Sequence, residues 1–230
     1  MQELKEILKD IEFFRYKYHI TEFLQDCFSM FAIAISNRFD IANYKEREEE
    51  YLKTINKYSK EEQDKICSIL GKIILLYGGE KSQYNDFLGS LFMLCNSFSK
   101  EFGQFFTPYS VSKLMAKLVV KNYDLTKEVV VVNDCCCGGG GLLIACVEEL
   151  ERQGVPKERI LVVGQDIDRR CVNMSYIQLS LLGIPAVILK GDTISYKFND
   201  IWRTPAYYLN FNKFEQALGN ACKIGVKGVA

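Results

Sequence analysis

Residues Val129–Gly141 read VVVVNDCCCGGGG, and this stretch decides the fold of the chain. Four consecutive β-branched residues favour a strand, and a run of this length is too short for a helix. The glycines that follow allow a sharp backbone turn, and residues 142–151 resume the three-to-four-residue apolar spacing of a helix. The stretch therefore predicts a strand, a glycine-rich turn and a helix in succession.

The same alternation continues along the chain. Ile160 to Val163 is a second apolar strand ending at Asp166, residues 169–182 have helical spacing, and Ala186 to Leu189 is a third strand ending at Asp192. Strands that alternate with helices predict an α/β fold with a parallel sheet and right-handed crossovers. Ligands of such sheets bind at the carboxyl ends of the strands, where all three distinctive loops fall.

Residues 1–100 are predicted to be helical throughout, because apolar residues such as Leu4, Leu8 and Ile11 recur at three-to-four-residue spacing. The mixed charges of residues 45–50 indicate a solvated helix face. The character of the sequence changes near residues 98–103. We therefore divide the chain into a helical N-terminal region, 1–100, and an α/β domain, 101–230.

Composition excludes several classes of protein. The 230 residues carry 29 Lys and Arg against 29 Asp and Glu, so the whole surface is not a polycation. No apolar run reaches the roughly 18 residues that span a bilayer, and the amino terminus does not resemble a secretion signal. We expect a cytoplasmic protein, no membrane association, and free thiols for its nine cysteines. A single histidine argues against a metal site.

Acidic residues follow each predicted strand. The glycine turn alone could serve NAD, FAD, S-adenosylmethionine or no ligand. Asp166 lies at the separation expected of a carboxylate that binds ribose hydroxyls, and Ile167 beside it could pack on adenine. Asp192, followed by Thr193, could accept from an adenine amino group. Together they predict an adenosine-binding groove, with loop capping by these acids as the alternative.

Several motifs resemble those of N6-adenine DNA methyltransferases, above all the modification subunit of type I restriction-modification systems. The resemblance covers about residues 84–194. In chain order, the motifs are Asp86–Phe92 (DFLGSLF), Gly103–Pro108 (GQFFTP), Asp134–Ala145 (DCCCGGGGLLIA), Gly164–Asp168 (GQDID) and Gly191–Thr193 (GDT).

This resemblance implies a partial Rossmann-like sheet of an S-adenosylmethionine-dependent methyltransferase. It implies that Thr107 and Pro108 lie against the methionine end of the cofactor and that Asp134 receives the methionine amino group. Asp166 would bind the ribose and Asp192 the adenine amine. The full set of implied cofactor-binding residues is Phe106, Thr107, Pro108, Asp134, Cys136, Gly138, Gly140, Asp166, Ile167, Asp192 and Thr193. The triple cysteine then needs no metal, because small, soft side chains fit a tight turn.

The catalytic signature of the family, Asn/Asp-Pro-Pro-Tyr/Phe after the fourth strand, is absent from the sequence. Residues 204–207 (TPAY) are a degenerate candidate, in which Thr204, Pro205 and Tyr207 would be catalytic. A threonine hydroxyl is a poorer acceptor for the target amine than a carboxylate or amide. Two functions therefore stay open: an N6-adenine DNA methyltransferase of impaired activity, and a non-catalytic protein that binds DNA or a restriction-modification subunit.

The predicted sheet is incomplete at its carboxyl-terminal part. We place at most one further strand, near residues 207–211, which leaves an open sheet edge. The N-terminal helices, a specificity subunit or a second copy of the chain would cover that edge. A weak basic bias after residue 186 is compatible with phosphate contacts, so we expect only weak DNA binding by the chain alone.

Overall fold

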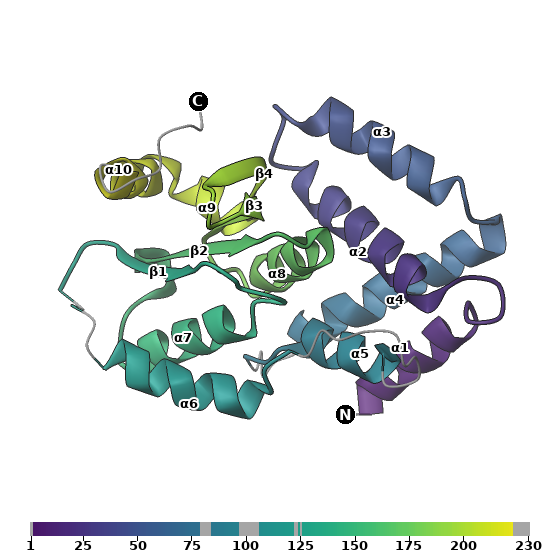
Figure 1. The fold of residues 1–230 in the computed structure, drawn as a ribbon, viewed down its shortest axis with the longest axis horizontal. Helices are drawn as coiled ribbons and strands as arrows, with labels where there is room; N and C mark the ends of the chain where they lie inside the picture. Colours follow the sequence, from purple (N-terminus) through teal and green to yellow (C-terminus); the bar gives the residue numbers. More distant parts are fainter. Residues whose placement is uncertain (1, 79–83, 97–105, 122–123, 125, 223–230) are drawn as a thin grey trace.

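The computed structural model describes residues 2–78, 84–96, 106–121, 124 and 126–222 (Figure 1). The N-terminal part of the chain is helical, as the sequence predicts. Its helices are α1 (Gln2–Glu12), α2 (Ile20–Ser36), α3 (Tyr44–Ile55), α4 (Lys60–Gly78) and α5 (Phe87–Asn96). The helix α6 (Tyr109–Val120) then leads into the sheet.

The sheet has the order β1-β2-β3-β4 within the described residues. Its first three strands are parallel: β1 (Val130–Asp134), β2 (Ile160–Asp166) and β3 (Ala186–Asp192). All three confirm the strands expected from the sequence. The glycine turn, Asp166 and Asp192 therefore lie together at the carboxyl ends of these strands.

The fourth strand differs from the expectation. The strand β4 (Lys197–Arg203) runs antiparallel to β3 as the second arm of a hairpin, and residues 205–209 form the short helix α9 (Pro205–Leu209). The prediction of a strand near residues 207–211 is therefore wrong. Pro205 at the first turn of α9 has the fixed φ of a helix start, which ends the strand at Arg203.

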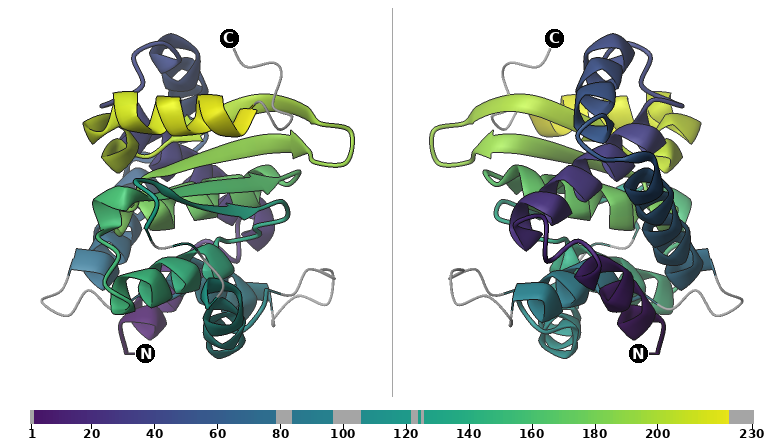
Figure 2. Two further views of the ribbon diagram at one scale, coloured as in Figure 1. Left: turned by 90° about the vertical axis from the view of Figure 1, so that its left-hand side faces the viewer. Right: turned by 90° about the vertical axis from the view of Figure 1, so that its right-hand side faces the viewer.

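Helices cover both faces of the sheet (Figure 2). One face packs on α7 (Gly141–Arg152) and α8 (Arg169–Leu181), and α6 lies against α7. The other face is covered by α9 and α10 (Phe211–Cys222). Successive residues of β2 point to opposite faces of the sheet. Ile160 and Val162 pack in the larger core, whereas Leu161 packs on the other face with Tyr207 and Phe214.

The N-terminal helices share a core with the sheet domain. One buried apolar cluster extends from Leu4 in α1 to Trp202 in β4, and α2 packs along α8. The sequence junction near residues 98–103 lies outside the described residues, so the division at residue 100 stays a prediction.

Arg47 departs from the expected solvated face of α3. The side chain is 4% exposed, and Nη1 lies 2.8 Å from Oδ2 of Asp40. Its Nη2 donates to the Ile201 carbonyl at 2.8 Å, and the guanidinium lies 3.8 Å from the centre of the Trp202 ring. The prediction is therefore wrong at this position: Arg47 fastens α3 to β4.

The strand β1 forms one edge of the sheet. It pairs with β2 alone among the described residues, which agrees with the expected open edge. In that same part of the chain, no helix is long and apolar enough to cross a bilayer.

Candidate functional site

A cavity of about 540 Å³, here called the glycine-turn cavity, opens at the carboxyl ends of the parallel strands. Its lining comes from the residue before α5, the approach to α6 and the start of that helix, the turn after β1 with the start of α7, the end of β2 and the start of α8. Of the expected cofactor residues, the cavity is lined by Phe106, Thr107, Asp134, Cys136, Gly138 and Asp166. The GQFFTP motif contributes Phe106 and Thr107 to this lining, and its first three residues, Gly103, Gln104 and Phe105, lie outside the described residues.

The turn after β1 depends on a side-chain contact of Asp134 and on the absence of a side chain at Gly138. Oδ1 of Asp134 accepts from the N–H of Cys136 at 3.0 Å, which starts the turn. Gly138 has φ +54°, a left-handed conformation that favours glycine, and a Cβ at this position would lie 3.2 Å from the Phe106 ring. The absence of a side chain therefore lets Phe106 and the turn approach each other across the cavity.

Asp166 ties the second strand to this turn. Its Oδ2 accepts from the N–H of Gly138 at 2.9 Å, and its Oδ1 accepts from the N–H of Asp168 at 2.9 Å. Burial raises the pKa of the Asp166 carboxyl, although both N–H donors act to lower it. A carboxylate has about four acceptor sites, so Asp166 can still bind a ligand hydroxyl beside these N–H donors.

The cysteines of the turn have different environments. Cys135 and Cys136 are exposed and Cys137 is buried, and both Cys136 and Cys137 line the cavity. Burial raises the pKa of the Cys137 thiol to about 12, so it stays protonated at neutral pH. Across the described residues, no group of three or more His, Cys, Asp or Glu could hold a metal ion.

Asp192 and its neighbours lie at the same edge but do not line the cavity. Oδ1 of Asp192 accepts from the N–H of Ile194 at 2.9 Å, and Oδ2 accepts from the Ser195 hydroxyl at 2.8 Å, so the carboxylate caps the β3–β4 hairpin. These bonds lower the pKa of Asp192. Asp192 is thus not among the residues that line the cavity with Asp134 and Asp166, and its adenine contact stays a prediction.

The remaining expected cofactor residues surround the cavity without lining it. Ile167 is 71% exposed at the end of β2. The Thr193 hydroxyl donates to the Cys135 carbonyl at 2.8 Å and thereby ties the end of β3 to the turn. Pro108 is the N-cap of α6, and Gly140, with φ +91°, is the N-cap of α7.

The candidate catalytic residues lie at the other end of the sheet, beside the amino-terminal end of β3. They are Thr204, Pro205 and Tyr207. Because β4 runs antiparallel, its end meets the beginning of β3. The Thr204 hydroxyl accepts from the N–H of Ala186 at 2.9 Å and donates to the Ile184 carbonyl at 2.7 Å. Thr204 and Tyr207 are both fully buried. Their positions give these residues a structural role and provide no support for the catalytic interpretation.

Replacement of Thr204 by valine should lower the free energy of unfolding by about 1–3 kcal/mol, because the buried N–H of Ala186 loses its acceptor. Urea unfolding measures this change, and Thr126→Val, at an exposed threonine, is the control. Ligand affinity should stay unchanged. A valine variant of wild-type stability with altered ligand binding would instead favour a role for Thr204 in the site.

Sequence reasoning did not assign several residues that line the cavity. They are Asp86, Ser112, Met115, Cys137, Gly139, Gly141, Leu142 and Cys171. Asp86 was visible as the first residue of the DFLGSLF motif, but that motif implied only a helix. The glycines and Cys137 belong to the turn itself, and Ser112 and Met115 follow from the helical period of α6.

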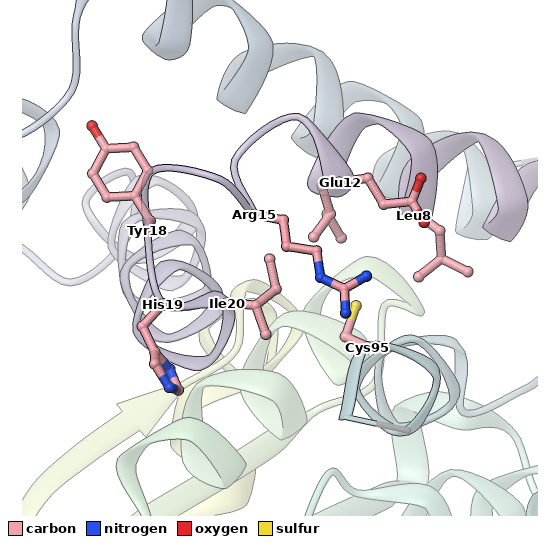
Figure 3. A pocket seen from close by; sticks show the side chains of 8 residues that line it. Leu8, Glu12, Arg15, Tyr18, His19, Ile20 and Cys95 are labelled. Atoms are coloured by element: carbon pink, nitrogen blue, oxygen red, sulfur yellow. The ribbon is translucent and has the colours of Figure 1, made fainter. Parts of the chain in front are cut away.

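A second cavity, of about 200 Å³, lies among the N-terminal helices (Figure 3). Its lining includes apolar side chains of α1 together with Arg15, His19 and Cys95. In Figure 3 the Arg15 side chain extends toward Cys95 of α5. None of the expected site residues lines this cavity, so the glycine-turn cavity is the candidate site.

The parallel strands, the helices on both faces and the glycine turn define the class of this protein: a Rossmann-like α/β fold. The chain belongs to the N-6 DNA methylase family, because the sequence model of that family matches residues 84–216, more than half of the chain.

The solved structures that are similar to the chain include the following two. A class I S-adenosylmethionine-dependent methyltransferase from Listeria monocytogenes has 20% identity and a TM-score of 0.43, over 75% of this chain and 54% of that one. The methyltransferase subunit of a type I restriction-modification system from Streptococcus thermophilus has 20% identity and a TM-score of 0.41, over 62% of this chain and 30% of that one. The chain thus matches about half the length of the first and less than a third of the second. No curated protein sequence matches the chain.

Proposed function

We propose that the chain binds S-adenosylmethionine in the glycine-turn cavity and serves N6-adenine DNA methylation. The observation that carries this proposal is the joint presence of Asp134, Asp166 and the glycine turn around one cavity. Its volume of about 540 Å³ lies within the usual range for small-molecule sites.

The chemistry of the lining fits this ligand. S-adenosylmethionine supplies a methyl group on a cationic sulfonium. Asp134 is suited to the methionine amino group and Asp166 to the ribose hydroxyls, while Phe106 and Thr107 line the approach from α6. Gly138, Gly139 and Gly141 let the backbone come close to the ligand, and the start of α7 offers N–H groups to a carboxylate.

Calorimetric titration with S-adenosylhomocysteine, the demethylated product, tests the proposal. We expect binding by the wild type and a loss of about tenfold or more in affinity for Asp134→Ala and for Asp166→Ala, since each removes a charged hydrogen-bond acceptor. Asp64→Ala is a suitable control, because the Asp64 side chain is 68% exposed and pairs with Lys60 one helical turn away, far from the cavity lining. Absence of heat and of a thermal shift with the wild type would refute the proposal.

A second candidate function is a non-catalytic member of the family that binds DNA or a restriction-modification subunit. Two observations favour it: the sequence contains no Pro-Pro pair, and Thr204 lies at the sheet edge opposite the cavity. The two candidates differ in one measurement. The non-catalytic candidate predicts cofactor binding without transfer of labelled methyl groups to adenine-containing DNA. For this candidate we propose that the partner binds at the open edge of β1.

A further inference from the structure

Asp86, the residue immediately before α5, is a third carboxylate of the cavity beside Asp134 and Asp166. It is 4% exposed and lines the cavity together with the glycine turn. Its Oδ1 accepts from the N–H of Gly89 at 2.9 Å and from Nε2 of Gln178 at 2.9 Å. Oδ2 has no hydrogen-bond donor within the part of the chain that the structure describes. One oxygen is therefore committed to the protein and the other is available.

The glycine at the start of α7 makes room for this carboxylate. A Cβ at Gly141 would lie 2.7 Å from Oδ2 of Asp86, closer than a real contact permits. Asp86 thus reaches past Gly141 at the beginning of α7, where the free N–H groups of a helix favour a negative charge. No ion pair among the described residues neutralises Asp86.

Gln178 fixes the orientation of Asp86. Its Nε2 also donates to the Gly139 carbonyl at 2.6 Å, and its Oε1 accepts from the N–H of Leu88 at 3.1 Å and from the Tyr77 hydroxyl. Gln178 is fully buried, so these bonds join α4, α5 and α8 to the glycine turn. Gln178 is therefore a positioning residue, and Oδ2 is the oxygen of Asp86 left for the cavity.

A buried carboxylate without a cation is costly. Burial raises the pKa of the Asp86 carboxyl, although Gln178 and the N–H of Gly89 act to lower it. A cationic group placed beside Oδ2 would offset this cost. The ammonium of an amino acid is such a group, and its three N–H donors allow two carboxylates to share it.

We infer that Asp86 binds the α-ammonium group of the methyl donor, alongside Asp134, and that Gln178 holds it in position for this contact. The inference rests on the proposed function, because it assigns a further residue to the same ligand. It makes the N-terminal helices part of the cofactor site, since Asp86 and Tyr77 both precede the sheet domain.

Asp86→Asn is the informative variant. The amide oxygen can replace Oδ1 as acceptor for Gly89 and Gln178, and the amide nitrogen then takes the place of Oδ2. Only the charge and the acceptor facing the cavity are lost. Calorimetry should use two probes: S-adenosylhomocysteine and an analogue of it that lacks the α-amino group. We expect Asp86→Asn to reduce affinity for the first by about tenfold or more and to leave affinity for the second unchanged.

Asp64→Asn is the matched control and should bind both probes as the wild type does. Gly141→Ala is a second variant, which should displace the Asp86 carboxylate and reduce affinity for the first probe more than for the analogue. Equal binding of S-adenosylhomocysteine by wild type and Asp86→Asn would overturn the inference and leave the proposed function standing. Failure of the wild type to bind would remove the proposed function itself.

Discussion

Replacement of Trp202 by alanine should lower the free energy of unfolding by about 3–5 kcal/mol, the usual cost of truncating a large buried aromatic side chain. Trp202 in β4 is fully buried, and its ring lies 5.1 Å from the ring of Tyr176 in α8. The Arg47 guanidinium stacks on it at 3.8 Å, and the indole N–H donates to Oδ2 of Asp200 at 2.8 Å. The truncation therefore leaves a cavity and removes the apolar surface that packs against a buried charge.

Urea unfolding followed by circular dichroism measures this loss through the midpoint, provided that the slope is unchanged. Leu209→Ala is the control, because this side chain of α9 is 81% exposed and its truncation should cost no more than about 0.5 kcal/mol. A loss below 1 kcal/mol for Trp202→Ala would contradict the role of β4 as the strand that joins the N-terminal helices to the sheet.

Replacement of Gly138 by alanine should reduce affinity for S-adenosylhomocysteine by about tenfold or more, in the range of one lost charged hydrogen bond. Two effects combine at this position. The left-handed φ of +54° is unfavourable for alanine, and the new Cβ would lie 3.2 Å from the Phe106 ring, which lines the cavity. The turn must shift, and with it the N–H that holds Oδ2 of Asp166.

Gly183 provides the matched control for this substitution. Its φ is +64°, close to that of Gly138, but a Cβ there would meet nothing within 4 Å. Both alanine variants should lose about 1–2 kcal/mol of stability from the left-handed backbone. Only Gly138→Ala should lose affinity. Equal affinity in the two variants would show that Phe106 and the turn do not shape the ligand site.

Local patterns in the sequence predict much of the fold. The β-branched run before the glycines, and the apolar segments that end at Asp166 and Asp192, identify β1, β2 and β3, because buried parallel strands are short continuous apolar runs. The strand β4 was not recognised, since its sequence KFNDIWR mixes polar and apolar residues without clear alternation. The hairpin that carries it places Thr204 at the end of the sheet opposite the glycine-turn cavity.

For the site, the sequence predicts which loops meet but not which side chains reach the cavity. Asp134 and Asp166 both line the cavity, because parallel strands bring their carboxyl ends to the same end of the sheet, and their contacts with a cofactor stay predictions. Asp192 lies at that edge too, but Ile194 and Ser195 occupy its oxygens. No local rule distinguishes a carboxylate that caps its own loop from one that is available to a ligand.

The succession of strands, glycine turn and helices follows from the amino-acid sequence, since it depends on the residue types in short windows. The surroundings of three buried side chains depend instead on how the layers pack. Arg47 lies in a charged helical segment but is buried against Trp202, and Thr204 closes the far edge of the sheet. Asp86 is oriented toward the cavity by a hydrogen bond from Gln178, a residue 92 positions later in the chain. Contacts between such distant residues exist only after the layers have packed, so their chemistry follows from packing and not from local propensity.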